Sequence, residues 1–132
     1  MKRILKYALI ITRNNKILLQ KEAKHTLLLL PGGKPKKKET PEQCIKREIM
    51  EAIKADIDVA SLRYLGRFED INAEGDAIVT VELYAGTLLS RPKTSRVVRK
   101  LIWFGKKSNQ KLLSPVIRNK ILPYLIAVRM VQ

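Results

Sequence analysis

One capped helix lies between runs of strand-like residues, and this junction constrains the fold more than any other part of the sequence. Thr40 is placed as an N-cap, proline follows at the first helical position, and Gln43 stands where a capping box needs it. Ile45 and Ile49 belong to an apolar series with helical spacing. This series predicts a helix from about residue 41 to about residue 55, with that face toward the core.

Alternating and apolar runs on both sides of this helix predict β-strands. Between the first two runs, Asn14 and Asn15 can take the positive φ angles of a tight hairpin turn. A last helix is expected from Ser114, with a kink or break at Pro123, because proline lacks the amide hydrogen that a helix interior needs. This order of elements predicts an α/β or α+β fold with a mixed sheet and a helix on each side. The expected strands cover residues 5–12, 16–21, 25–30, 60–68, 76–89 and 95–105.

The charge balance limits the kinds of partner that the chain can have. Its length suits one domain, residues 1–132. Lys and Arg number 27 against 12 Asp and Glu, a formal net charge of +15. This excess is tolerated most easily when the usual partners are anions such as nucleotides, nucleic acid or phosphorylated metabolites. Every acidic residue lies at or before Glu82, so any carboxylate chemistry must come from the first two thirds of the chain.

Cysteine content and hydropathy indicate the compartment. Cys44 is the only cysteine, so no intramolecular disulfide can form, and its place in the expected helix favours a core thiol over a nucleophile. The apolar N-terminal run alternates and lacks a small-residue cleavage site, which indicates a strand and not a signal peptide. No apolar run approaches the roughly 20 residues of a membrane span. We therefore expect a cytoplasmic protein with no membrane partner.

The residues around the start of the helix have the chemistry to bind phosphate and metal. Pro31 ends the third expected strand, and a turn at Gly32 and Gly33 lets the backbone approach a diphosphate closely. Glu48 and Glu51 lie one helical turn apart, and magnesium takes one or two protein carboxylates while phosphate oxygens and waters complete its shell. Spacing alone also allows a second interpretation, in which these glutamates belong to an exposed helix face with ordinary surface ion pairs.

The same stretch resembles the signature of the Nudix (MutT-like) hydrolases. The residues that match this signature in type and register, without a gap, are Gly33, Glu39, Arg47, Glu48, Ile49 and Glu51. The preceding Leu-Pro-Gly-Gly-Lys is the usual lead-in of the family, and the resemblance extends over nearly the whole chain. It implies an α/β/α sandwich that hydrolyses a nucleoside diphosphate linked to another moiety, using Mg2+ or Mn2+. Dimers are frequent in the family, so a homodimer is a further expectation.

The resemblance also implies roles for particular residues of the expected helix. Glu48 and Glu51 correspond to metal ligands or to residues that assist them. Glu39 and Arg47 correspond to a buried pair that orients the helix. These residues form the expected catalytic group.

The glycine-lysine loop supplies the expected substrate-binding residues. The diphosphate would lie between this loop and the helix, and lysines would partly substitute for metal charge. The carbonyl oxygen of Gly32 or Gly33 corresponds to a further metal ligand. The loop residues expected to bind substrate are Gly32, Gly33, Lys34 and Lys36.

Two departures from the family pattern weaken the expected metal site. Ala52 stands where the family has its second paired glutamate, and Lys54 stands where it has the glycine that ends the motif. A methyl group cannot coordinate metal. The stretch before the tryptophan, residues 93–102, contains basic residues and no acid, although family members often bring another carboxylate from there. We therefore expect weak binding of the divalent ion, because ligand charge sets much of the affinity.

Other acidic residues are candidates for the missing general base. Glu82 is the most prominent, because it interrupts an alternating strand. His25, the only histidine, is expected to face solvent or substrate. The full set of acidic candidates is Glu69, Asp70, Glu74, Asp76 and Glu82.

Three functions remain open at the level of the sequence. The first is a Nudix-type hydrolase that cleaves the diphosphate linkage of a nucleoside diphosphate derivative. The second is a Nudix-fold protein that binds nucleotide or RNA through its basic surface without hydrolysis. The third, a small basic nucleic-acid-binding domain, has the least support, because aromatic residues make up only 5% of the chain and no nucleic-acid motif is present. The substrate itself is not defined by the sequence.

Overall fold

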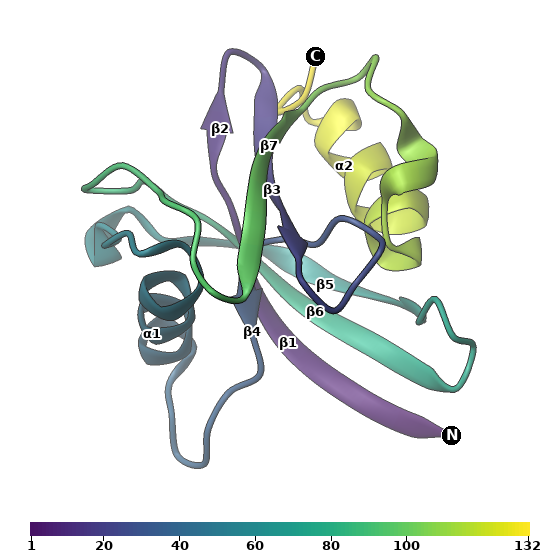
Figure 1. Ribbon diagram of the computed structural model, residues 1–132, viewed down its shortest axis with the longest axis horizontal. Helices are drawn as coiled ribbons and strands as arrows, with labels where there is room; N and C mark the ends of the chain where they lie inside the picture. The colour runs from purple at the N-terminus through teal and green to yellow at the C-terminus, as the bar shows by residue number, and fades with distance from the viewer.

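Two β-sheets lie at the centre of the protein, with helical segments on opposite sides of them (Figure 1). The computed structural model describes residues 1–132. The chain is therefore an α/β fold with mixed sheets, as the order of elements in the sequence predicts. No helix is both long enough and apolar enough to cross a membrane.

The larger sheet is mixed and has the strand order β4-β1-β6-β5. Its centre is a parallel pair between β1 (Lys2–Ile10) and β6 (Ala77–Ala85), which stay in register over their whole length. At one edge β5 (Arg63–Ile71) pairs antiparallel with β6, and at the other the short strand β4 (Gly32–Gly33) pairs antiparallel with β1. The glycine pair is thus hydrogen-bonded to the sheet.

The smaller sheet is antiparallel, with the order β2-β3-β7. It contains β2 (Thr12–Arg13), β3 (Lys16–Glu22) and β7 (Val98–Phe104). The turn between β2 and β3 confirms the hairpin prediction, since Asn14 and Asn15 have φ angles of 50° and 64°. Two 3₁₀ turns, Val59–Ser61 and Gln110–Leu112, lie in the connections.

Helix α1 (Pro41–Ile53) begins as the sequence predicts. The Thr40 side chain accepts a hydrogen bond from the Gln43 amide, and the Gln43 side chain accepts one from the Thr40 amide, which completes the capping box. The buried face of α1 packs on an apolar cluster shared with both sheets. The helix ends two residues earlier than predicted, because Lys54 takes the left-handed conformation with φ of 55°.

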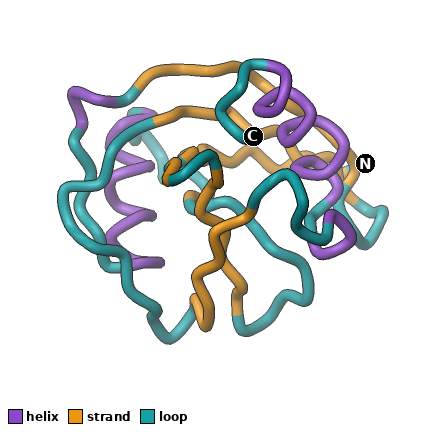
Figure 2. Tube along the Cα trace, turned by 90° about the horizontal axis from the view of Figure 1, so that it is seen from above, coloured by secondary structure: helices purple, strands orange, loops and turns teal.

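The C-terminal helical segment covers the opposite side (Figure 2). It consists of a π-helical turn, η3 (Ile117–Ile121), followed by α2 (Leu122–Ala127). The irregular turn lies just before Pro123, where a kink or break was predicted, but helical structure continues from it into α2 without a break. The missing amide hydrogen of proline accounts for the irregular hydrogen bonding. Residues of this segment and of both sheets form the larger apolar cluster, whose buried members include Leu19, Val81 and Leu125.

Residues 25–30 do not form the predicted strand. Leu29 pairs with Gln20 and Leu28 with Leu113, each through an isolated bridge. Neighbouring residues therefore bond to different parts of the chain, and no continuous ladder forms. The glycines, where a turn was predicted, form strand β4. The Pro31 carbonyl just before them accepts a hydrogen bond from the Leu9 amide of β1.

Several other strand boundaries also differ from the prediction. Strand β1 covers residues 2–10 where 5–12 was expected, and β6 ends at Ala85 where residue 89 was expected. Strand β5 continues through Asp70 to Ile71, where a turn was expected after Phe68. It is an edge strand with alternating exposure, so its acidic side chains stay in solvent without breaking the ladder. Strand β7 begins only at Val98, after the basic loop.

Candidate active site

The glycine pair brings the backbone of β4 close to both β1 and α1. At Gly32 the φ angle is +141°, and a Cβ atom would collide with the backbone oxygen of Tyr7. At Gly33 a Cβ atom would lie 2.5 Å from the carboxyl group of Glu48. Gly32 therefore has no room for a side chain because the backbone of β1 approaches it, whereas at Gly33 the neighbour is the flexible side chain of Glu48.

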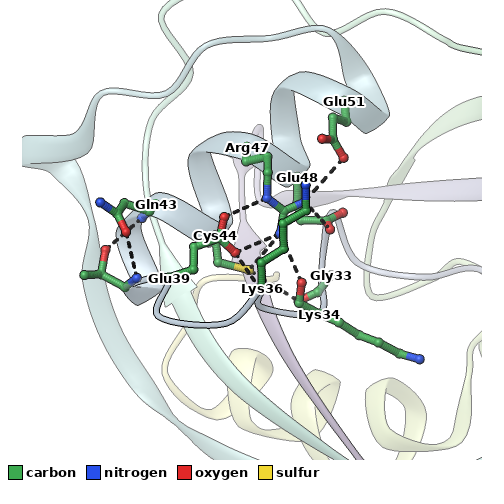
Figure 3. A network of polar contacts seen from close by, with 10 residues as sticks. Gly33, Lys34, Lys36, Glu39, Gln43, Cys44, Arg47, Glu48 and Glu51 are labelled. Carbon is green, nitrogen blue, oxygen red and sulfur yellow. Dashed lines mark hydrogen bonds and ion pairs between the residues drawn. The ribbon is translucent and has the colours of Figure 1, made fainter.

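Arg47 holds the acidic side chains of this region together (Figure 3). Its Nη1 atom donates to Oε1 of Glu48 at 2.8 Å and to Oε2 of Glu51 at 3.3 Å. Its Nη2 atom donates to the Lys34 carbonyl oxygen at 3.1 Å. One guanidinium thus links α1 to the loop that follows the glycine pair.

Glu39 is the third carboxylate bound by Arg47. Its side chain is 12% exposed and also accepts a hydrogen bond from the Lys36 amide at 2.8 Å. The hydrogen bonds from Arg47, and then that from the amide, lower the pKa of Glu39 to about 2 from its ordinary value of 4.5. The Arg47 pKa is raised, chiefly by the same hydrogen bonds with Glu39.

Cys44 lies beneath this network and is fully buried. Its Sγ atom donates to the Gly33 carbonyl oxygen at 3.7 Å. Burial raises the pKa of the thiol to about 12. The side chain is therefore a core thiol, as its place in the helix predicts, and not a nucleophile.

Glu48 and Glu51 each keep one carboxylate oxygen that no protein group binds, Oε2 of Glu48 and Oε1 of Glu51. Their side chains are 22% and 58% exposed. These oxygens are the available metal donors of the region, with two carboxylates as magnesium commonly uses. No group of three or more His, Cys, Asp or Glu side chains is arranged to hold a metal ion.

Because position 52 is alanine, the C-terminal half of α1 offers only the carboxylates of Glu48 and Glu51 as possible metal ligands. The residue lies one turn after Glu48 on α1, and it is 8% exposed against the apolar cluster beneath the helix. A methyl group closes the core at the position where a third carboxylate would extend the pair. The residues present thus fit a weak divalent-ion site that depends on other ligands, such as phosphate oxygens.

A cavity of about 420 Å³ opens next to the glycine pair. Gly32, Gly33 and Lys34 line it, whereas Lys36 does not. Its volume lies in the range of small-molecule sites. Its apolar wall comes from the larger sheet, the segment before β4 and the C-terminal segment, and it includes Leu29, Leu30, Val79, Val81 and Ile117.

The acidic residues considered as general bases are mostly engaged elsewhere. Glu82 binds Arg67 at 2.8 Å and the Tyr64 hydroxyl. Glu69 accepts from Thr80, and Asp70 and Asp76 bind asparagine side chains. Glu74 is the member of this set that lines the cavity.

The sequence motifs did not identify three charged residues that line the cavity, namely Lys6, Glu22 and Lys24. His25, which was expected to face solvent or substrate, lines the cavity with them. The signal for Lys6 was present in the sequence: it is a lysine on the same strand face as Ile4 and Ala8, where an apolar residue is the norm.

Residues 2–112 match the NUDIX domain family. The chain belongs to the Nudix family. No curated protein sequence matches the chain significantly. The match covers the glycine pair, the Arg47 network and the strands that build the cavity.

Solved structures share this Nudix fold. A NUDIX hydrolase from Nitrosomonas europaea has 19% identity and a TM-score of 0.76, over 96% of this chain and 90% of that chain. The MutT protein of Methanosarcina mazei has 15% identity and a TM-score of 0.72, over 96% of each chain. A bifunctional NMN adenylyltransferase/ADP ribose pyrophosphatase from Francisella tularensis, complexed with AMP and a manganese ion, has 20% identity and a TM-score of 0.65, over 96% of this chain and 42% of that chain. These likenesses show that the chain has the fold of these Nudix structures.

Proposed function

We propose that this Nudix protein hydrolyses the diphosphate linkage of a nucleoside diphosphate derivative. The observation that carries the proposal is the position of Arg47, which binds Glu48 and Glu51. The Glu48 carboxyl group lies against Gly33, and Gly33 lines the cavity. A substrate in the cavity would present its diphosphate to the free oxygens of these two glutamates. The Francisella protein supports this class of substrate, because it is a pyrophosphatase seen with a nucleotide.

In this proposal Glu39 and Arg47 position the catalytic carboxylates. Arg47 fixes the direction of both glutamate side chains, and Glu39 fixes Arg47. Gly32 and Gly33 allow the close approach of substrate phosphate to the backbone, and Lys34 contributes charge at the cavity wall. Lys36 acts through its amide, which orients Glu39, more than through its side chain.

Mg2+ or Mn2+ is the proposed cofactor, held by Glu48 and Glu51. The ion would neutralise charge on the phosphoryl group and would lower the pKa of a bound water molecule. With two protein carboxylates the affinity for the free ion is low, and substrate phosphate oxygens complete the donor set. Arg47 keeps one oxygen of each glutamate occupied, which leaves the other free for the ion.

A second candidate function is binding of nucleotide or RNA without hydrolysis. The fifty residues after Glu82 contain no acid, and none of their lysines or arginines takes part in a salt bridge. Such a surface attracts polyanions in a salt-dependent way. The absence of a carboxylate at Ala52 is the observation that supports this second candidate.

Hydrolysis and metal binding by matched variants distinguish the two functions. The wild-type protein, Ala52→Glu and Ala52→Gln are assayed with Mg2+ or Mn2+ against ADP-ribose, dinucleoside polyphosphates, nucleoside triphosphates and capped RNA. Calorimetry measures the affinity of each variant for the ion. Turnover of one substrate class by the wild type supports the hydrolase.

The glutamine variant controls for side-chain size at position 52. We expect Ala52→Glu to bind the ion at least about tenfold more tightly than Ala52→Gln, because it adds a charged oxygen ligand. Turnover that appears only in Ala52→Glu, while the wild type binds nucleotide, would exclude hydrolysis and support the binding function.

A further inference from the structure

Lys6 is a half-buried lysine in the wall of the cavity, on strand β1. Its side chain takes part in none of the salt bridges of the protein. Burial is the main cause that lowers its pKa. A lysine that is withdrawn from water without a partner is costly, so its presence requires an explanation.

Three acidic residues lie close enough for their charge to raise the pKa of Lys6, but none of them forms an ion pair with it. Glu22 accepts a hydrogen bond from the Gln20 side chain at 2.8 Å and lies 3.7 Å from His25. Glu48 is bound by Arg47. Glu74 has the smallest effect on Lys6 and is exposed in the turn between β5 and β6. The positive charge of Lys6 is thus left without a dedicated counter-charge.

A second lysine, Lys34, follows the end of β4 and lines the same cavity as Lys6. Tyr7 pairs with Gly33 at the end of the antiparallel ladder, Lys6 and Lys34 are the next residues of the two segments, and both lysines line the cavity. Lys34 contributes to the lowering of the Lys6 pKa by repulsion. Like charges on neighbouring segments repel each other, and an anion bound between them removes this repulsion. In Figure 3 the Lys34 side chain runs away from the Arg47 network.

We propose that Lys6 and Lys34 form a binding site for the phosphate group attached to the nucleoside of the substrate. A phosphate accepts charge-assisted hydrogen bonds from ammonium groups, and the apolar wall of the cavity offers space for a nucleobase or ribose. The site adjoins Gly33, and a Cβ atom at Gly33 would lie 2.5 Å from the carboxyl group of Glu48. Lysine charge at this place substitutes in part for a weakly bound ion.

This inference rests on the proposed function for the identity of the ligand, but it does not depend on hydrolysis. Its test is therefore a binding measurement without metal. The probes are the α,β-methylene analogues of ADP, GDP, CDP and UDP, titrated by calorimetry in the presence of EDTA. The proteins are the wild type, Lys6→Gln, Lys6→Arg, Lys34→Gln and Lys37→Gln.

Lys37→Gln is the matched control, because Lys37 is an exposed lysine of the same loop that does not line the cavity. We expect Lys6→Gln to lower the affinity for the analogue that binds best by about 10- to 100-fold, which is the range for the loss of a hydrogen bond to a charged group. Lys34→Gln should lower this affinity less, because the Lys34 side chain is exposed. Lys6→Arg should stay within about threefold of the wild type, because the charge is kept.

Three results would overturn the inference. One is an unchanged affinity in both Lys6→Gln and Lys34→Gln. Another is an equal loss in Lys37→Gln, which would show that only the net charge matters. The third is a wild-type protein that binds none of the analogues. Hydrolysis by the wild type is measured separately, with metal. A failure of the lysine site therefore appears in the binding titrations, and a failure of the proposed activity appears in the hydrolysis assay.

Discussion

Arg47 donates two parallel hydrogen bonds to Glu39, from Nε to Oε2 at 2.7 Å and from Nη2 to Oε1 at 2.8 Å. Glu39 lies in the loop before α1, and Arg47 lies in the middle of that helix. The pair therefore fixes the loop against the helix with the forked geometry that only arginine provides. The same guanidinium reaches Glu48 and Glu51, so the shape of the loop and the direction of both glutamates depend on one side chain.

Replacement of Arg47 should destabilise the protein and release the glutamates. We expect Arg47→Ala to lower the free energy of unfolding by about 1–3 kcal/mol, because hydrogen bonds to charged groups are lost and three carboxylates then lack their common partner. Arg47→Lys should recover only part of this loss, since an ammonium cannot form the paired bonds. Urea unfolding monitored by circular dichroism measures the effect.

Lys46→Ala is the control for loss of a positive charge on the same helix. Lys46 forms an exposed pair with Asp56, so its replacement should change the free energy of unfolding by less than about 1 kcal/mol. Equal effects of the two alanine variants would contradict the central role of Arg47.

Glu39 should contribute to acid sensitivity. Its pKa is about 2 in the folded protein against an ordinary value of 4.5, so its contribution is complete above pH 4.5. That contribution is lost as the pH falls from 4.5 through about 2, because the unfolded chain binds the proton first. Urea midpoints measured across this range should fall more steeply for the wild type than for Glu39→Gln. Parallel curves for the two proteins would show that Glu39 keeps an ordinary pKa.

The two glycines should respond differently to the same substitution. Gly32→Ala should destabilise the protein by about 2–3 kcal/mol, because the new Cβ atom meets backbone and the φ angle is unfavourable for alanine. Gly33→Ala should cost less than about 1 kcal/mol, since the Glu48 side chain can move aside. Its effect should instead appear as weaker metal or nucleotide binding in calorimetry. A reversed order of stability would contradict the contacts described for these residues.

Lys54 should be replaceable by glycine with a gain in stability. It ends α1 with φ of 55°, a conformation that costs a side chain about 1–2 kcal/mol. After the greater freedom of glycine in the unfolded chain is subtracted, Lys54→Gly should stabilise the protein by about 0.5–1 kcal/mol. Thermal unfolding of Lys54→Gly and of Lys54→Ala tests this, because alanine should give no gain.

Local signals in the sequence were sufficient for the elements around the site. The capping box of Thr40 and Gln43 and the paired asparagines of the first hairpin act within a few residues, so their geometry follows from chemistry alone. The irregular turn before Pro123 follows in the same way. The Nudix motif further indicated that Glu39 and Arg47 would pair, as they do.

Features that depend on distant pairing were not predictable. Residues 25–30 have the composition of a strand, yet Leu28 and Leu29 bond to partners at opposite ends of the chain. The strand at Gly32 and Gly33 exists only because β1 approaches it. Lys6 belongs to the cavity for the same reason, since its strand face is defined by elements that follow much later in the sequence.

The long parallel pair of β1 and β6 also determines how the protein can fold. Residues 2–10 find their partners only at residues 77–85, and β3 finds β7 only at residues 98–104. Pairing over such sequence separations slows folding, because a long loop must close before any contact forms. During synthesis, the first strand therefore leaves the ribosome well before its partner exists. Until residues 77–85 emerge, β1 has only the two-residue strand β4 as a partner, and the rest of its backbone must be kept from pairing with other chains.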